Sequence, residues 1–275
     1  MIQILLATFN GAKYLEVQLD SLLAQTYNSW TLLVHDDGSE DQTFDILKAY
    51  QRKYPDIIEI LEDGLIFGNA RDNFTHLITN ATSEYVMFCD QDDVWLPEKI
   101  EKTVAKMQVL ERLYAGLPIV VHTDLVVVDE SLHSIAPSMF EYQGLDKSIN
   151  SLLQILAKNS VTGCTMMVNQ QAIAVSLPIL SSAVMHDWWI AANVIKQQGV
   201  VEFIDEPLIR YRQHSSNSVG AKKQSIFTFV NRCFTYAFHQ ETRVKVWNQA
   251  KAIQPNLNRC CFFAKKVHIT IKSLF

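Results

Sequence analysis

The stretch Val-Met-Phe-Cys-Asp-Gln-Asp-Asp, residues 86–93, passes from an apolar run directly into three carboxylates within four residues. A short apolar run predicts a buried strand, whose carboxyl end must then reach solvent or a site. Carboxylates this close raise one another's pKa unless a cation holds them, and hard oxygen ligands suit Mg²⁺ or Mn²⁺. The stretch therefore predicts a divalent-metal site at the end of a strand. The alternative is an acidic loop before a helix that begins near Pro97.

The composition predicts one large α/β domain with an appendage, or two small domains. The chain has 275 residues, of which 48% are hydrophobic and 19% charged, which provides for a substantial core and argues against disorder. No apolar run is long enough to span a bilayer, and the first residues lack the basic region of a secretory signal. The five cysteines have neither zinc-site spacing nor an even disulfide framework, so we expect a reducing cytoplasm.

Charge is distributed unevenly along the chain. Residues 222–275 hold ten lysines and arginines and one acid, whereas the rest holds 14 of the 24 basic residues and 28 of the 29 acidic ones. The basic segment is also aromatic, with Phe227, Phe229, Phe234, Tyr236, Phe238, Trp247, Phe262 and Phe263. This combination predicts contact with an anionic membrane surface, or else a helical appendage whose aromatic side chains pack on the body or on another subunit. No nucleic-acid recognition motif is present.

Apolar runs and helical periodicities alternate in the first half of the chain. Strands are expected at residues 2–7, 30–34, 57–61, 85–89 and 119–128, and helices at 11–26, 39–54, 69–79 and 97–114. The second of these helices would open with a capping box of Ser39 and Gln42. The second half mixes strands at 161–168, 200–204 and 208–212 with a helix at 187–197. This order predicts a mostly parallel, Rossmann-like sheet with helices on both faces.

Three of the predicted strands are followed by clusters of polar residues. These clusters are Thr8-Phe9-Asn10, Asp36-Asp37 and the acidic residues that begin at Asp90. In a parallel sheet, ligands bind beyond the carboxyl ends of the strands. Ordinary turn chemistry explains each cluster separately, but it does not explain why all three fall on one edge. We therefore expect one binding site along that edge.

Seven short motifs occur in an order typical of one enzyme family. They are Thr8-Phe9-Asn10, residues 21–26, residues 36–39, residues 68–71, residues 90–93, Gly163-Cys164-Thr165 and residues 186–189. With them the chain resembles a family 2 glycosyltransferase of the GT-A fold, from Ile2 to about Gly220. The forms at 90–95, 186–189 and 211–214 are most similar to the bacterial rhamnosyltransferase-like branch. The resemblance implies a GT-A domain at 1–220, with a nucleotide-binding half at about 1–125 and an acceptor half at about 126–220, followed by a basic, aromatic, helical extension at 221–275.

The resemblance implies transfer of a hexosyl or deoxyhexosyl unit, with inversion, from a UDP- or dTDP-sugar to a saccharide acceptor. That acceptor would be a lipid-linked or protein-linked glycan of a bacterial surface. Asp92 would be the direct ligand of Mn²⁺ or Mg²⁺, and Asp90 would bind the ribose or assist the metal. His214 would be a third metal ligand or a diphosphate contact, although a lone histidine is more often structural. Such an enzyme is expected in the cytoplasm, with peripheral attachment to the inner face of the plasma membrane or homo-oligomerisation through residues 222–275.

The donor pocket is implied by the same resemblance. Asp37 would accept the N3–H of uracil or thymine, with Thr8 and Asn10 lining the pocket. Arg71 would contact the base or the pyrophosphate, because a guanidinium is a fixed cation that makes forked contacts.

On the acceptor side, the resemblance makes Asp187 the general base, although this residue could instead only cap its helix. Trp188 and Trp189 would supply an apolar wall that raises the pKa of the base. Because adjacent helical residues point in different directions, we expect one tryptophan in the core and one facing the sugar. Gly163 and Cys164 would line the acceptor pocket or mark a bulge.

Other functions compete with this interpretation. A haloacid-dehalogenase-like phosphatase would use Asp90 as a phosphorylated nucleophile, but that family places its acidic loop after the first strand. A sugar-nucleotide pyrophosphorylase would need a glycine-rich loop with Arg and Lys after the first strand, which residues 8–13 lack. A catalytically inactive scaffold with the same fold is the third alternative.

Overall fold

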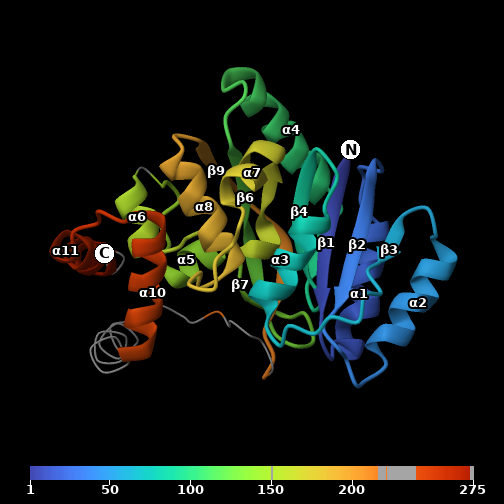
Figure 1. The fold of residues 1–275 in the computed structure, drawn as a ribbon. Coiled ribbons are helices and arrows are strands. Elements are labelled where there is room, and N and C mark those ends of the chain that lie inside the picture. Colours follow the sequence, from blue (N-terminus) through green and yellow to red (C-terminus); the bar gives the residue numbers. More distant parts are fainter. Residues whose placement is uncertain (150, 216–220, 222–239, 273–275) are drawn as a thin grey trace.

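The computed structural model describes residues 1–149, 151–215, 221 and 240–272. Within them a sheet forms the centre of the molecule and helices cover both of its faces (Figure 1). The sheet has nine strands in the order β3-β2-β1-β4-β8-β6-β9-β5, with β7 paired to β6. The predicted α/β class is therefore confirmed.

The strands are β1 (Ile2–Thr8), β2 (Trp30–Asp36), β3 (Ile58–Ile60), β4 (Tyr85–Asp90), β5 (Val94–Trp95), β6 (Ile119–Val128), β7 (Ser134–Ala136), β8 (Met167–Asn169) and β9 (Val200–Arg212). The helices are α1 (Ala12–Leu23), α2 (Thr43–Lys53), α3 (Ala70–Asn80), α4 (Lys99–Leu113), α5 (Met139–Gln143), α6 (Leu152–Ala157), α7 (Gln170–Ser176), α8 (His186–Lys196), α10 (Gln240–Ile253) and α11 (Arg259–Lys272). A 3₁₀ turn, η1, spans Gly163–Thr165.

The parallel arrangement predicted for the sheet is found in its first half. Strands β3, β2, β1 and β4 are all parallel, and Thr8 is paired with Asp36 while Ala7 is paired with Asp90. This register brings the three polar clusters to one edge, as predicted. The second half is mixed, because β8 runs antiparallel between β4 and β6 while β6 and β9 are parallel.

Alternation along the strands divides the core into two layers. In β1, Ile4 and Leu6 face the layer that packs against α1, α2 and α4, whereas Leu5 faces the opposite layer. The second layer contains buried side chains of α3, α6, α7, α8, α10 and α11. Leu15, Leu19 and Leu22 place one apolar stripe of α1 on the first layer, which is the spacing that predicted this helix.

The start of α2 differs from the predicted capping box. Helix α2 begins at Thr43, and its N-terminal residue Gln42 makes no side-chain cap. Ser39 instead donates its Oγ and its backbone N–H to the Asp36 carboxylate, at 2.7 and 2.8 Å. The capping box is therefore wrong, because residues 39–42 form a turn around the end of β2 and not the first turn of a helix.

Two predicted strands of the second half also differ from the structure. The strand expected at 161–168 is replaced by η1 and the short β8. The strands expected at 200–204 and 208–212 form one strand, β9, with register shifts against β6 between Thr123 and Val126. The short elements β5, β7, α5, α6 and α7 were not predicted, because segments of two to seven residues show little periodicity.

The C-terminal helices α10 and α11 pack against α6 and α8 at one end of the molecule (Figure 1). Phe262 is fully buried in the second core layer, and the ring of Trp247 lies 5.4 Å from its ring. The aromatic residues of this segment were predicted either to contact a membrane surface or to pack on the body or another subunit. Those that the structure describes, Trp247, Phe262 and Phe263, pack on the body. Phe227, Phe229, Phe234, Tyr236 and Phe238 lie outside the described residues. Among the helices that are described, none is both long and apolar enough to cross a membrane.

Replacing Phe262 with alanine tests whether α11 is part of the fold. Because the ring is 0% exposed, we expect the free energy of unfolding to fall by about 3–5 kcal/mol. Urea denaturation followed by circular dichroism measures this. Val267→Ala on the same helix is the matched control, since Val267 is 57% exposed and its loss should change stability by less than about 0.5 kcal/mol. Equal stability of the two variants would contradict the packing of α11 on the body.

Candidate active site

The two carboxylates after β2 have different surroundings. Asp36 accepts hydrogen bonds from Thr8 Oγ1 at 2.7 Å and from Ser39, so its charge is used to hold the turn. Asp37 is buried, and its Oδ1 accepts the backbone N–H of Phe67. A carboxylate has about four acceptor sites, so Asp37 has capacity to accept a further donor. Sequence alone could not tell which of these neighbours faces the edge of the sheet.

The predicted pocket residues Thr8 and Asn10 hold this turn in place. The Thr8 side chain is buried against Asp36, while exposed Asn10 accepts the backbone N–H of Glu40 at 2.8 Å through its Oδ1. The backbone N–H of Asn10 donates to Ser39 Oγ. The Thr8 carbonyl also accepts the backbone N–H of Asp37 at 2.9 Å, and direct contact of Thr8 or Asn10 with a nucleobase stays a prediction.

Gln91 joins the loop after β1 to the loop after β4. Its side-chain amide exchanges two hydrogen bonds with the backbone of Phe9, both at 2.9 Å. Gly11 permits this approach, because a Cβ there would lie 2.1 Å from Gln91 Oε1. Gln91 was not predicted as a site residue, although its place between two aspartates was the available signal.

Asp90 and Asp93 form a close group with the thiol of Cys164 at the end of β4. Their ligand atoms all lie within 4.8 Å of one another. Burial raises the pKa of Asp90 to about 7, and the charges of Asp92 and Asp187 add to this shift. Burial and the neighbouring aspartates also raise the pKa of Asp93 well above its usual range. Burial and the repulsion between neighbouring carboxylates thus both disfavour the charged forms of these two acids.

Asp92, in the same loop, meets the residues that follow β9. His214 Nε2 lies 2.7 Å from Asp92 Oδ2, and the imidazole ring packs on Tyr14 at 4.6 Å. Arg212 holds the loop from behind, since its Nε donates to the backbone carbonyl of Asp92 at 2.8 Å and its backbone N–H donates to Asp93 at 3.1 Å. The structure thus brings His214 to Asp92 across more than a hundred residues, and binding of a metal by these two residues with Asp90 stays a prediction.

Asp187 stands at the first turn of α8, next to the same acidic group. Its carboxylate accepts the backbone N–H groups of Trp188 and of Gly163, at 2.5 and 3.1 Å. Burial raises its pKa to about 6, although these hydrogen bonds and one from Asn159 favour the charged form. Asp187 binds the backbone of Gly163, and the next residue, Cys164, belongs to the close group with Asp90 and Asp93, so Asp187 lies near these acids.

The turn η1 connects Asp187 to the acidic group. The Gly163 N–H binds Asp187, while the next residue, Cys164, is buried beside Asp90 and Asp93, and burial raises the pKa of its thiol well above the usual range. The predicted acceptor-lining role of Cys164 is therefore not what its position shows, because the side chain faces the carboxylates from inside. A Cβ on Gly163 would meet the His186 ring at 2.9 Å, so glycine is needed for the close approach of η1 to α8.

One of the two tryptophans, Trp189, is in the core as expected, whereas contact of Trp188 with a sugar stays a prediction. Trp189 is buried, and its Nε1 donates to the carbonyl of Ser176 at 2.7 Å, so its acceptor role is wrong. Trp188 is half-buried against α6, where its Nε1 donates to the carbonyl of Ile155.

Arg71 is engaged elsewhere in this structure. Its Nε and Nη2 donate to both carboxylate oxygens of Asp72 at 2.7 Å, and its Nη1 donates to the carbonyls of Ser181 and Ala183. The guanidinium therefore ties α3 to the segment before α8. A contact with the base or the pyrophosphate would require these bonds to be exchanged, and it stays a prediction.

Lys99 is a charged residue that the sequence analysis missed. It is fully buried at the start of α4, with its Nζ 3.5 Å from the centre of the Trp95 ring. Within the described residues the Nζ has no hydrogen-bond partner. Burial lowers the pKa of Lys99 to about 7, which the charges of Cys164, Cys89 and Asp93 oppose. The only signal in the sequence was its position two residues after Pro97.

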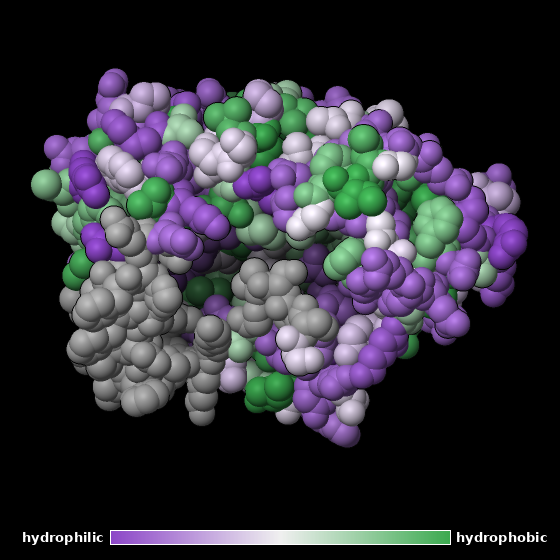
Figure 2. Space-filling view, turned by 60° about the horizontal axis from the view of Figure 1, so that its bottom comes forward, coloured by the Kyte–Doolittle hydropathy of each residue, from purple (hydrophilic) through white to green (hydrophobic). Residues whose placement is uncertain are grey.

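Figure 2 shows the face toward which the carboxyl ends of β1, β2 and β4 point. The surface is hollowed near its middle, and hydrophilic residues line much of the margin of this hollow. The donor set at this edge fits a hard divalent cation, because Asp90 and Asp92 both offer half-buried carboxylate oxygens. Asp93 and the thiol of Cys164 are fully buried behind them.

A family model described as glycosyl transferase family 2 matches residues 3–173. The curated dTDP-rhamnosyl transferase RfbG of Shigella flexneri is 26% identical over 227 residues, which are 78% of this chain and 74% of that protein. The putative teichuronic acid biosynthesis glycosyltransferase TuaG of Bacillus subtilis is 26% identical over 240 residues, 83% of this chain and 87% of that one. The match of the family model includes the acidic loop, whereas Asp187 and His214 lie beyond it.

Solved structures share the fold. TarS 1–349 of S. aureus in complex with UDP-GlcNAc matches with a TM-score of 0.61 and 16% identity, covering 100% of this chain and 81% of that one. The mannosyltransferase PcManGT of Pyrobaculum calidifontis, in complex with GDP-Man and Mn²⁺, matches with a TM-score of 0.59 and 13% identity, covering 98% and 80%. At these identities the likeness shows a common fold.

Proposed function

This chain belongs to glycosyl transferase family 2 and is a glycosyltransferase of glycan synthesis, and we propose that it transfers a hexosyl or deoxyhexosyl unit from a UDP- or dTDP-sugar with inversion. The acceptor is a saccharide of a bacterial surface glycan. The observation that carries this proposal is that Asp187 binds the backbone of Gly163 in η1, while the next residue, Cys164, lies in a close group with Asp90 and Asp93.

The donor-side acids are assigned different tasks. Asp92, with His214 against its Oδ2, and Asp90 would hold a divalent cation, Mn²⁺ or Mg²⁺. Such a cation would neutralise the negative charge that develops on the departing diphosphate. The buried Asp93 and Lys99 support the loop from behind, and Arg212 fixes its backbone.

Asp187 acts as the general base on the acceptor hydroxyl. Its raised pKa of about 6 suits a base that must be ionised near neutral pH and yet accept a proton. The backbone N–H groups of Gly163 and Trp188 orient the carboxylate. A single displacement by the activated hydroxyl, on the side of the sugar opposite the leaving diphosphate, inverts the anomeric centre.

Asp37 is assigned to the nucleobase. A buried carboxylate would accept the N3–H of uracil or thymine, whereas cytosine carries an acceptor at N3. We expect UDP to bind at least about tenfold more tightly than CDP in the presence of Mn²⁺. Titration calorimetry with the two nucleotides measures this ratio, and Asp37→Asn should reduce it. Equal binding of UDP and CDP would contradict the assignment.

The donor sugar is then found by a thermal-shift panel of UDP- and dTDP-sugars, with GDP-mannose included because the structural neighbour PcManGT was solved with it. Each sugar that stabilises the protein is tested for transfer and hydrolysis. If GDP-mannose alone stabilises the protein, the assignment of a pyrimidine nucleotide to the donor site is wrong. Membership of glycosyl transferase family 2 does not depend on that result.

The competing functions are not retained. A phosphatase with Asp90 as nucleophile disagrees with the family match, which includes residues 90–93 at the end of the fourth strand. An inactive scaffold would have no need to keep Asp90, Asp92 and Asp187 around one site. A role of residues 222–275 at a membrane surface or between subunits stays a proposal, and residues 222–239 and 273–275 of that segment lie outside the described residues.

A further inference from the structure

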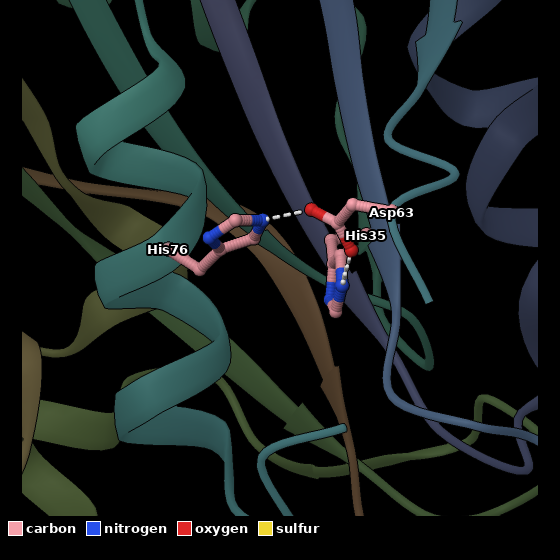
Figure 3. A group of neighbouring side chains, drawn as sticks. All are labelled: His35, Asp63 and His76. Atoms are coloured by element: carbon pink, nitrogen blue, oxygen red, sulfur yellow. Dashed lines mark hydrogen bonds and ion pairs between the residues drawn. The ribbon is translucent and has the colours of Figure 1, made fainter. Parts of the chain in front are cut away.

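Two histidines and an aspartate converge at a place that the transfer reaction does not use. His35 lies near the end of β2, Asp63 follows β3, and His76 is on α3 (Figure 3). His76 Nε2 is 2.6 Å from Asp63 Oδ2, and His35 Nε2 is 3.4 Å from Asp63 Oδ1. The three ligand atoms lie within 4.8 Å of one another. We propose that His35, Asp63 and His76 bind a transition-metal ion such as Zn²⁺.

The orientation of His35 supports a ligand role. Its Nδ1 lies 2.8 Å from Asn73 Oδ1, and the Asn73 amide is turned so that its Nδ2 faces the His35 carbonyl at 3.4 Å. With Nδ1 held by Asn73, Nε2 is the ring nitrogen that faces Asp63. Metal-binding histidines are commonly held in this way by a second hydrogen bond.

The spacing fits a tetrahedral ion with small adjustments. Ligand atoms about 2.1 Å from zinc are about 3.4 Å apart, which is the distance between His35 Nε2 and Asp63 Oδ1. The contact between His76 and Asp63 would lengthen by about 0.8 Å. The side chain of Asp63 is 36% exposed and that of His76 is 16% exposed, so an ion can enter from solvent.

The ligand chemistry separates this site from the acidic one. Two imidazoles and one carboxylate favour Zn²⁺, Co²⁺ or Ni²⁺, whereas oxygen ligands favour Mg²⁺ or Mn²⁺. The ring of Phe67 packs on His35 and His76 at 5.4 and 5.2 Å and shields one side of the site. Three chain segments far apart in sequence would thereby be joined beside the sheet, without involvement of Asp92 or Asp187.

Metal titration of the chelator-treated protein tests the proposal. Zn²⁺ is titrated by calorimetry and Co²⁺ by its visible absorption bands, in the background of Asp92→Asn so that the acidic site does not contribute. We expect one ion per chain, and at least about tenfold weaker binding in His76→Gln and in Asp63→Asn. At a hundredfold excess over the dissociation constant, Zn²⁺ should raise the melting temperature by about 5 °C, and this shift should vanish in both variants.

Matched controls separate a built site from surface binding. His133→Gln removes an exposed histidine whose Nδ1 lies 3.2 Å from Asp129, and it should leave the affinity unchanged. Both test positions are near the surface, so the variants are expected to fold, which circular dichroism verifies. If His76→Gln and Asp63→Asn bind Zn²⁺ as the parent does, or the parent binds none at neutral pH, the three residues form only a hydrogen-bonded group and the proposal is wrong.

Discussion

Replacing Asp187 with asparagine is expected to lower kcat for sugar transfer by about 10²–10⁴-fold, because the acceptor hydroxyl loses its base. The amide keeps the shape of the side chain, so the dissociation constant of the donor nucleotide should change little. Steady-state transfer and calorimetric binding of the nucleotide measure the two quantities separately. Asp205→Asn is the matched control, since Asp205 is an exposed carboxylate that pairs only with Lys147 among the described residues.

The pH dependence of the parent provides a second measure of the same residue. Burial raises the pKa of Asp187 to about 6, and only the carboxylate can accept the proton. The rate should therefore be constant above that pKa and fall about tenfold per pH unit below it. The residual activity of Asp187→Asn should lack this acid limb. If Asp187→Asn keeps full transfer activity, another group removes the proton.

Replacing Asp92 with asparagine is expected to abolish cation-dependent binding of the donor and to lower transfer by about 10³-fold. In the parent, the negative charge of the Asp92 carboxylate would hold the cation. The substitution replaces this carboxylate, which lies 2.7 Å from His214 Nε2, with a neutral amide. Calorimetry with UDP, in the presence and absence of Mn²⁺, distinguishes this effect from a loss of turnover. Mn²⁺ should strengthen binding of UDP to the parent and have no effect on the variant.

Asp56→Asn, at an exposed position near β3, serves as the control for the Asp92 variant. The two active-site variants should also differ from each other, because Asp92→Asn loses donor binding and Asp187→Asn retains it. If Mn²⁺ still strengthens UDP binding to the Asp92 variant, Asp92 is not the main ligand of the cation. The cation site would then be assigned to Asp90 and Asp93, whose ligand atoms lie close to each other and to that of Cys164.

Most of the first half of the fold could be predicted from the sequence. Five of the six strands before residue 130 lie within two residues of their predicted bounds, because each is a mainly apolar run that is followed by polar residues. The sixth, β5, has only two residues and was not predicted. The single strand β9 was divided in two because Pro207 interrupts its pattern, and the structure accommodates that proline at a register shift against β6. The short helices of the second half, α5, α6 and α7, are stabilised by packing on the rest of the chain. They are too short to show a helical hydrophobic periodicity in the sequence.

The sequence predicted some residues of the candidate site but misassigned or missed others. Asp90, Asp92, Asp187 and His214 were named from the sequence, and the structure brings them to one end of the sheet. Trp189 and Cys164 were assigned to the acceptor but are buried, because the side on which a residue of a helix or turn lies depends on its neighbours. Lys99 and Gln91 were missed because their roles come from contacts across the two loops.

The sequence by itself determined the order of the strands in the chain, the edge at which their polar ends gather and the family to which the chain is related. These are local properties, since apolar runs and turn residues act over a few positions. Only the tertiary structure decided that Asp36 holds a turn while Asp37 is free to accept a further donor, and that burial raises the pKa of Asp187. It also brought His35, Asp63 and His76 together. Distance and burial between residues far apart in the chain arise only when the elements pack.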